Sequence, residues 1–240
     1  MKRRMKKFTI PQKIEVSMRF LFITMTSAAI IFRVITLDRA EDEWEGITSL
    51  FIALILFFIP TIFSKRTKIK IPVPFQIFFL IFVYFAMYLG EVYDYYYKFY
   101  WWDSLLHLTS SLMLAYIGFL LIFALNKDKN AHMNLSPFFM ALFTFCFAMA
   151  CAAIWEIFEF LVDEIFNVNM QKARNLCTDS LCNSRTGVMD TMSDLVEGAV
   201  GALIVSVIGF YYCKKKMIQD NVFWKLKDQF IEENPNLFDK

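Results

Sequence analysis

Three long apolar segments of the sequence each carry ionisable residues at helical spacing near one end. The stretch 101–125 reads WWDSLLHLTSSLMLAYIGFLLIFAL and contains an aspartate and a histidine four residues apart. The other two segments have carboxylates at positions i, i+3, i+7 and at i, i+4, i+7. Residues at these spacings share one face of a helix. The pattern predicts three helices that each present one polar stripe, formed by Asp103 and His107, by Glu156, Glu159 and Asp163, and by Asp190, Asp194 and Glu197.

The three stripes contain seven carboxylates and a single imidazole. Glu91 and Asp94, after an earlier apolar segment, would add to the negative charge, and Arg33 is the evident positive partner besides His107. Carboxylates this close together either carry protons or neutralise a bound cation. Carboxylate oxygens with one imidazole suit Mg²⁺, Mn²⁺, Ca²⁺ or Fe²⁺, and zinc also binds such sets. The candidate metal ligands are Asp103, His107, Glu156, Glu159, Asp190 and Asp194, with Glu159 as the candidate catalytic nucleophile or base.

These residues also have structural interpretations. Asp103 and Asp190 stand where helix N-caps are expected, and aspartate satisfies the free N–H groups there. A single histidine in an apolar helix, such as His107, is often only a hydrogen-bonded structural residue. A charged side chain at this depth in a bilayer costs about 2–3 kcal/mol, however. Three aligned stripes therefore favour an arrangement in which they face one another around one cavity instead of facing lipid.

The composition places the helices in a membrane. Of the 240 residues, 58% are hydrophobic and 18% aromatic, which is outside the usage of soluble proteins. Windows long enough to cross a bilayer predict an all-α membrane bundle with six spans, at about 18–37, 46–63, 72–90, 103–125, 137–162 and 190–212. A basic segment, 1–17, precedes this membrane domain of 18–212. The tail, 213–240, is either an amphipathic helix on the membrane surface or a soluble extension.

The basic residues predict the orientation. Most of the 25 Lys and Arg lie in the N-terminal segment, in 64–70, in 126–130 and in the tail from 213. Six alternating spans put these four segments on the same side, and short basic loops stay cytoplasmic. We therefore expect a bacterial plasma membrane protein with both termini in the cytoplasm. The polar stripes would then lie in the outer halves of their spans.

Two further patterns concern the outer half of the protein. Gly198, Ala199, Gly201 and Ala202 form a small-residue surface suited to close helix packing in lipid. Cys177 and Cys182 lie in the long loop 163–189, where an external location would favour a disulfide. The sequence contains no phosphate-binding glycine loop, serine-hydrolase motif or nucleic-acid-binding signature. The expected partners are membrane lipids, and the sequence leaves protein partners and oligomeric state open.

The motifs resemble those of a known family. Taken in order, the motifs are Asp103-x-x-x-His107, Trp155-Glu156-x-x-Glu159 and Gly187-x-x-Asp190-Thr191-x-x-Asp194, followed by a Gly/Ala-rich span. This order resembles the YjdF-type bacterial membrane proteins and, more distantly, the VanZ-like group. The resemblance covers roughly residues 80–212. It implies a compact multi-pass membrane protein of unassigned activity, in which the acidic and histidine residues of these motifs form the polar set.

Three functions agree with these observations. The first is a metal-dependent enzyme that acts on a lipid or cell-envelope intermediate from the outer face. The second is a small ion- or proton-coupled transporter, since acidic residues within membrane helices are equally expected there. The third is a non-catalytic structural or sensing protein. The sequence lacks evident inverted repeats, and its acidic residues lie toward one side, which favours a site over a transport path.

Overall fold

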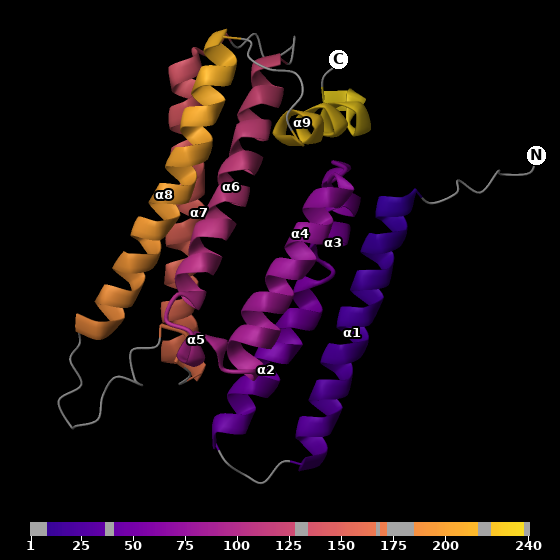
Figure 1. The fold of residues 1–240 in the computed structure, drawn as a ribbon, viewed down its shortest axis with the longest axis vertical. Helices are drawn as coiled ribbons and strands as arrows, with labels where there is room; N and C mark the ends of the chain where they lie inside the picture. Colours follow the sequence, from indigo (N-terminus) through magenta and orange to yellow (C-terminus); the bar gives the residue numbers. More distant parts are fainter. Residues whose placement is uncertain are drawn as a thin grey trace, which may run out of the picture. The chain divides into compact units, whose positions relative to one another are not determined.

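The computed structural model describes residues 9–36, 41–127, 134–166, 169–171, 185–215 and 222–237. Regular structure in these ranges is helical, and none of the residues described lies in a strand, as the sequence predicts. Figure 1 shows the elements in order along the chain. They are α1 (Ile10–Thr36), α2 (Glu41–Leu56), α3 (Ile59–Thr67), α4 (Val73–Val83), the π-helix η1 (Tyr84–Val92), α5 (Tyr95–Lys98), α6 (Trp102–Lys127), α7 (Pro137–Phe166), α8 (Arg185–Lys215), α9 (Val222–Glu233) and the 3₁₀ helix η2 (Pro235–Leu237).

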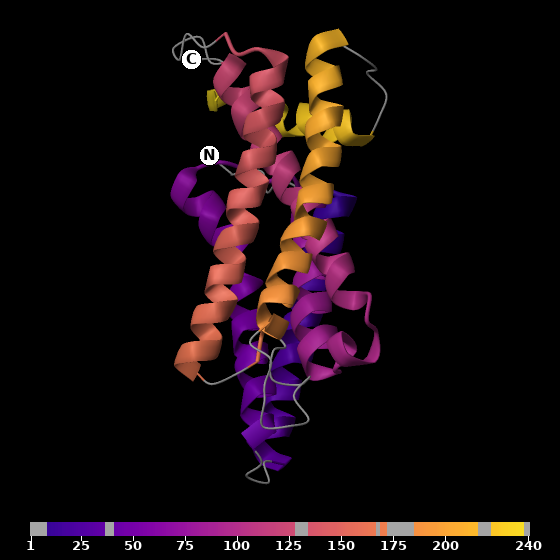
Figure 2. The ribbon, with the colours of Figure 1, turned by 90° about the vertical axis from the view of Figure 1, so that its left-hand side faces the viewer.

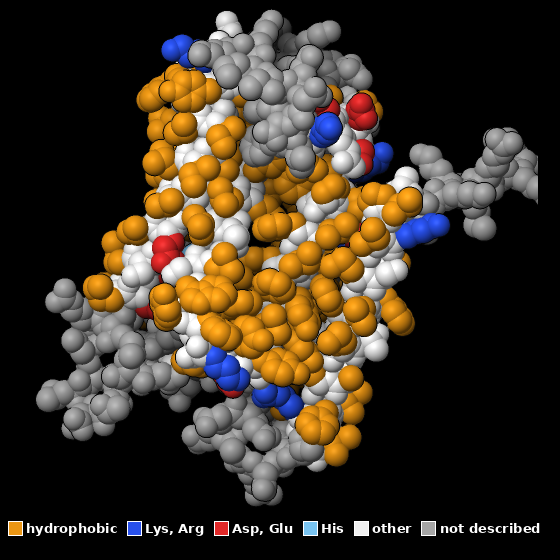
Figure 3. All heavy atoms as spheres, viewed as in Figure 1, with side chains coloured by type: hydrophobic (Ala, Val, Ile, Leu, Met, Phe, Trp, Pro, Cys, Tyr) orange, Lys and Arg blue, Asp and Glu red, His pale blue; other side chains and the backbone are white. Residues whose placement is uncertain are grey.

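Six helical stretches in the described part of the chain are long and apolar enough to cross a membrane, which confirms the predicted number of spans. They are Ile10–Ile35, Gly46–Thr67, Val73–Val92, Trp102–Asn126, Pro137–Ile165 and Gly187–Lys214. In Figure 3 hydrophobic side chains cover most of the helical surface in view. A surface of this kind is expected where helices face acyl chains instead of water.

The first helix begins at Ile10, eight residues before the predicted start of the first span. The side chain of Gln12 accepts the backbone N–H of Thr9 at 2.9 Å, which is one half of a capping box. Pro11 lies in the first turn, where a missing N–H costs nothing. These local signals start the helix before the apolar run does, so hydropathy alone places the boundary too late.

The chain forms two compact units. Unit 1 contains α1–α5 and η1 together with residues 225–234 of the C-terminal segment, and unit 2 contains α6, α7 and α8. In unit 1, α1 packs against α2 and α4, and α2 packs against η1. The side chains of Phe57, Leu80 and Val83 are fully buried in its core.

Unit 1 also holds a polar network that the sequence analysis did not predict. Arg19 on α1 forms an ion pair with Glu15 at 2.5 Å and donates to the hydroxyl of Thr61 on α3 and, at 3.2 Å, to the side-chain carbonyl of Gln76 on α4. Gln76 in turn donates to the carbonyl of Ile71 at 2.8 Å. This network joins three helices and supplies acceptors to a half-buried arginine, which apolar packing alone would not do.

The π-helix η1 continues α4 toward the short helix α5. Its residues Tyr84 and Tyr88 stack on each other, with ring centroids 4.9 Å apart, and Tyr84 also stacks on Phe22 of α1 at 4.6 Å. At its end, Arg33 of α1 donates a hydrogen bond of 3.3 Å to the carbonyl of Val92. A π-helix leaves more carbonyls without partners at its end than an α-helix does, and Arg33 satisfies one of them.

The helix α9 is attached to unit 1 by a side-chain amide. Asn234 accepts the backbone N–H of Lys70 at 2.6 Å and donates to the carbonyl of the same residue at 2.9 Å. Its amide also donates to the carbonyl of Phe230, which is buried. The C-terminal segment therefore has a fixed place beside the basic loop 64–70, which is more specific than the amphipathic or soluble tail that the sequence predicts.

In unit 2, each of α6, α7 and α8 packs against the other two. Figures 1 and 2 both show the three helices running side by side along most of their length. Small residues permit the closest approach: a Cβ added at Gly201 of α8 would lie 2.7 Å from the backbone carbonyl oxygen of Leu108 on α6, and Ala202 is fully buried. The small-residue surface predicted from the sequence does face a neighbouring helix.

Candidate functional site

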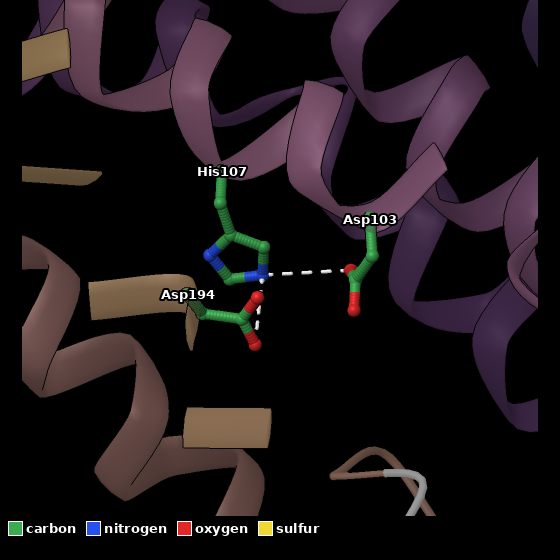
Figure 4. A group of neighbouring side chains, drawn as sticks. All are labelled: Asp103, His107 and Asp194. Carbon is green, nitrogen blue, oxygen red and sulfur yellow. Dashed lines mark ion pairs between the residues drawn. The ribbon is translucent and has the colours of Figure 1, made fainter. Parts of the chain in front are cut away.

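The side chains of Asp103, His107 and Asp194 converge in unit 2. Asp103 and His107 lie in the first turns of α6, and Asp194 lies on α8. The Nε2 atom of His107 is 3.5 Å from an oxygen of Asp103 and 3.6 Å from an oxygen of Asp194. Figure 4 shows all three side chains pointing toward one another. One ligand atom from each lies within 4.8 Å of the other two, so the three residues are close enough to bind one metal ion.

The other ring nitrogen of His107 also faces a carboxylate. Its Nδ1 atom is 3.9 Å from an oxygen of Glu156 on α7. The glutamate is only 4% exposed, as is Asp194. Carboxylates from all three helices of unit 2 therefore surround the imidazole, as expected if the polar stripes face a common interior.

The directions of the three helices explain why these residues meet. The ionisable residues occupy the start of α6, the end of α7 and the start of α8. Because α7 runs opposite to its two neighbours along the chain, these three ends lie at the same end of the bundle (Figures 1 and 2). Close packing at Gly201 then brings α8 near α6 directly beside the turn that carries His107.

Glu159 lies on the same buried face of α7 but has a different partner. One of its carboxylate oxygens accepts the indole N–H of Trp155 at 2.7 Å. It also acts electrostatically on His107, which places it near the imidazole. Trp155 itself is partly exposed, and its ring packs against Phe158, with centroids 5.3 Å apart. The buried Glu159 is therefore hydrogen-bonded to a residue on the exposed, apolar side of α7.

Asp163, the last carboxylate of the α7 stripe, accepts hydrogen bonds from the backbone of the turn that follows α7. Its two oxygens accept the backbone N–H groups of Met170 at 2.6 Å and Gln171 at 3.0 Å. A carboxylate that uses both oxygens in this way is already hydrogen-bonded. Its predicted place in the polar stripe holds, since it is buried on the same face, but its partners are local.

Asp190 and Glu197 complete the stripe on α8. Asp190, Glu156 and Asp103 are near enough to repel the charge of Asp194. The Oε2 atom of Glu197 is buried and has no hydrogen-bond donor among the residues that the structure describes. The N-cap interpretation is wrong for Asp190, because α8 already begins at Arg185. It is also wrong for Asp103, which lies inside the first turn of α6.

The remaining candidates belong to unit 1 or lie outside the described residues. Arg33, Glu91 and Asp94 belong to unit 1, where Arg33 contacts the end of η1 and Asp94 is exposed with Lys98 at 3.8 Å. Cys177 and Cys182 lie outside the described residues, so the disulfide stays a prediction.

Three residues near the site were missed by the sequence analysis as functional candidates. Trp155 belongs to the motif at 155–159, and its position four residues before Glu159 is the signal that could have indicated their hydrogen bond. Gln171 and Thr191 form a hydrogen bond of 3.0 Å between the turn after α7 and helix α8. No local spacing indicates that contact, because the two residues are brought together by the packing of α7 on α8.

The chemistry of the three converging side chains suits a hard or intermediate divalent cation. Two ligands on opposite sides of an ion with bonds of about 2.0–2.4 Å are about 4–5 Å apart, which matches the 4.8 Å within which these ligand atoms lie. One imidazole nitrogen with carboxylate oxygens is a donor set found with Mn²⁺, Fe²⁺ and Zn²⁺. The same geometry also fits a protonated imidazole held between carboxylates.

Comparisons with other proteins agree with a membrane protein. A family model described as "Predicted membrane protein (DUF2238)" matches residues 18–215, which includes all six spans in whole or in part. An uncharacterized protein of Thermotoga maritima is 25% identical over 171 residues, which cover 70% of this chain and 76% of that protein. No solved structure matches. These findings support the resemblance to the YjdF-type proteins, while the more distant VanZ-like link stays a prediction. The chain belongs to the DUF2238 family of predicted membrane proteins.

Proposed function

We propose that this protein binds one divalent metal ion through Asp103, His107 and Asp194, and that the bound ion serves catalysis on a lipid or cell-envelope intermediate. The observation that carries the proposal is the convergence of three ligand atoms within 4.8 Å, contributed by two helices of a membrane bundle. Acidic residues that were only solvated or only capped a helix would not be expected to gather around one half-buried imidazole.

The charges around His107 support a bound cation. Asp103, Asp194 and Glu156 all lie within 4 Å of its ring nitrogens. Carboxylates buried this close together repel one another, and isolated buried charges are costly. A divalent cation would offset that repulsion. Glu156 faces the other ring nitrogen, Nδ1, and would then orient the metal-bound histidine by accepting its N–H.

The metal would supply Lewis-acid chemistry or lower the pKa of a bound water. Three protein ligands leave coordination positions open for water and substrate in a site that prefers six ligands. Glu159 is the nearby carboxylate best placed to accept a proton, because one oxygen is already held by Trp155. A lipid substrate would reach it from the side of α7, where Trp155 and Phe158 are both exposed.

We further propose that the protein lies in the bacterial plasma membrane with both termini in the cytoplasm. The basic segments at the N-terminus, at 64–70 and after 213 support this orientation. The start of α6 and the end of α7 would then lie at the outer face. A substrate would therefore be an amphiphile of the outer leaflet.

Metal analysis of the purified protein tests the proposal. The protein would be purified in detergent without chelators and compared with the variants His107→Ala and Asp194→Asn, with Asp94→Asn as the matched control. We expect about one equivalent of metal in the wild type and in Asp94→Asn, because that carboxylate is exposed and lies in unit 1. The two site variants should lose the metal. A wild-type protein that takes up no metal on titration with Mn²⁺, Fe²⁺ or Zn²⁺ would contradict the proposal.

A proton-coupled transporter is the second candidate. It is favoured by one observation, namely that both ring nitrogens of His107 face carboxylates, as in groups that pass a proton between them. The two candidates differ in their response to His107→Ala: the enzyme loses its metal, whereas a transporter loses proton-dependent uptake without any change in metal content. Liposomes that contain the protein and a pH-sensitive dye would detect the proton flux.

A further inference from the structure

A chain of hydrogen bonds links the end of α7 to the start of α8. Asp163 on α7 accepts the backbone N–H groups of Met170 and Gln171 and so holds the turn 169–171 against its own helix. The side-chain amide of Gln171 then donates to the hydroxyl of Thr191 on α8 at 3.0 Å. The helices α7 and α8 are thus connected through the carboxylate of Asp163, the turn 169–171 and the hydroxyl of Thr191.

Thr191 occupies a position that matters for the site. It directly follows Asp190 and precedes Asp194 by three residues, which is less than one helical turn. A displacement of α8 by one residue along its axis corresponds to about 1.5 Å and a rotation of about 100°. Such a displacement would carry Asp194 away from His107, from which it is now 3.6 Å distant.

We propose that Asp163, Gln171 and Thr191 form a clasp that fixes the axial position of α8 against α7 and thereby holds Asp194 in place for metal binding. In the described part of the chain these three residues hydrogen-bond to one another and to the turn, and not to Asp103, His107 or Asp194, so they act as positioning residues. The consequence for metal affinity depends on the proposed function, whereas the consequence for helix position does not.

The clasp would set the axial position of α8 relative to α7. The chain between α7 and α8 runs from residue 167 to residue 184, which is far longer than the shortest connection between antiparallel helices needs to be. A long connection does not set how far one helix is shifted along the other. Ligation of a metal requires a defined shift, because ligand distances must hold within about 0.2 Å.

The test compares Thr191→Val with Thr191→Ser. Valine keeps the shape of threonine and removes the hydroxyl, whereas serine keeps the hydroxyl. We expect Thr191→Val to weaken Mn²⁺ binding about 10-fold, in the range of outer-shell substitutions, and Thr191→Ser to bind as the wild type does. Thermal unfolding in detergent serves as the control for folding. Mn²⁺ is the probe because its free concentration can be followed by its paramagnetic resonance signal.

A distance measurement supplies the readout that is independent of metal. Spin labels at Ile157 on α7 and Val196 on α8, which are 58% and 60% exposed, report the shift between the helices in a background without the native cysteines. We expect a broader distance distribution for Thr191→Val than for the wild type, and the wild-type distribution for Thr191→Ser.

The outcomes separate the two proposals. If the wild type binds no metal but Thr191→Val still broadens the distance distribution, the metal site is wrong and the clasp stands. If Thr191→Val leaves the distances unchanged, the clasp is overturned, whether or not the affinity changes. If the distances change while Mn²⁺ affinity stays at the wild-type value, the clasp does not position Asp194 and the inference fails.

Discussion

Replacing Gly201 with alanine should weaken metal binding without unfolding the protein. A Cβ at this position would lie 2.7 Å from the carbonyl oxygen of Leu108, and ordinary contact begins at 3.4 Å. The obstacle is backbone, so it cannot rotate away, and α6 and α8 must separate by about 0.7 Å. His107 immediately precedes Leu108, and its partner Asp194 lies two turns before Gly201 on the same helix. The two helices are therefore pushed apart close to His107 and Asp194.

The expected effect follows from the tolerance of metal sites. Ligand distances must hold within about 0.2 Å, and a displacement of about 0.7 Å is well outside that limit. We expect a loss of Mn²⁺ affinity of about 10- to 100-fold, comparable to the loss of a residue that hydrogen-bonds to a metal ligand. Isothermal titration in detergent or nanodiscs measures the affinity, and the thermal unfolding midpoint shows whether the bundle remains folded.

Gly198→Ala is the matched control. Its added Cβ would meet the hydroxyl oxygen of Ser111 at 2.9 Å and then Ala152 at 3.7 Å, and a hydroxyl can rotate to another rotamer. This variant should bind Mn²⁺ within about threefold of the wild type. If Gly201→Ala binds Mn²⁺ as tightly as Gly198→Ala and both are folded, the close approach of α6 and α8 does not hold the site together.

Three other predictions concern different parts of the molecule. Asn234→Ala removes the hydrogen bonds to the backbone of Lys70, so limited proteolysis should cleave the C-terminal segment faster than in the wild type; an unchanged cleavage rate would refute the attachment of α9. Lys98→Ala removes an exposed ion pair with Asp94 and an exposed hydrogen bond to the carbonyl of Tyr93, and it should change the free energy of unfolding by about 1 kcal/mol or less, which chemical denaturation would measure; a loss of several kcal/mol would contradict this. After treatment with an impermeant reductant, which opens the predicted disulfide with Cys182, an impermeant thiol reagent should label Cys177 in intact cells, and labelling only after lysis would reverse the proposed orientation.

The fold could be predicted largely from hydropathy, because six apolar segments leave little freedom in a bilayer. The polar stripes also followed from spacing, because residues four apart, such as Asp103 and His107 or Asp190 and Asp194, share one face of a helix. That these faces meet depends on the antiparallel order of α6, α7 and α8, which the alternation of spans implies. The small residues around Gly201 gave the position of the closest helix contact.

Other features could not be predicted, because they depend on contacts between residues that are distant in the sequence. Arg19 contacts Thr61 and Gln76 only because α1, α3 and α4 pack together. The partners of Asp163 lie in a turn whose conformation the sequence does not reveal.

The central claim is that one metal ion binds to His107 together with Asp103 and Asp194. Electron spin-echo spectroscopy of the Mn²⁺-loaded protein tests it directly, because a nitrogen bound to Mn²⁺ modulates the echo. We predict modulation from a single histidine nitrogen, which changes on ¹⁵N-histidine labelling and disappears in His107→Ala. An echo without nitrogen modulation in the loaded wild-type protein would contradict the account.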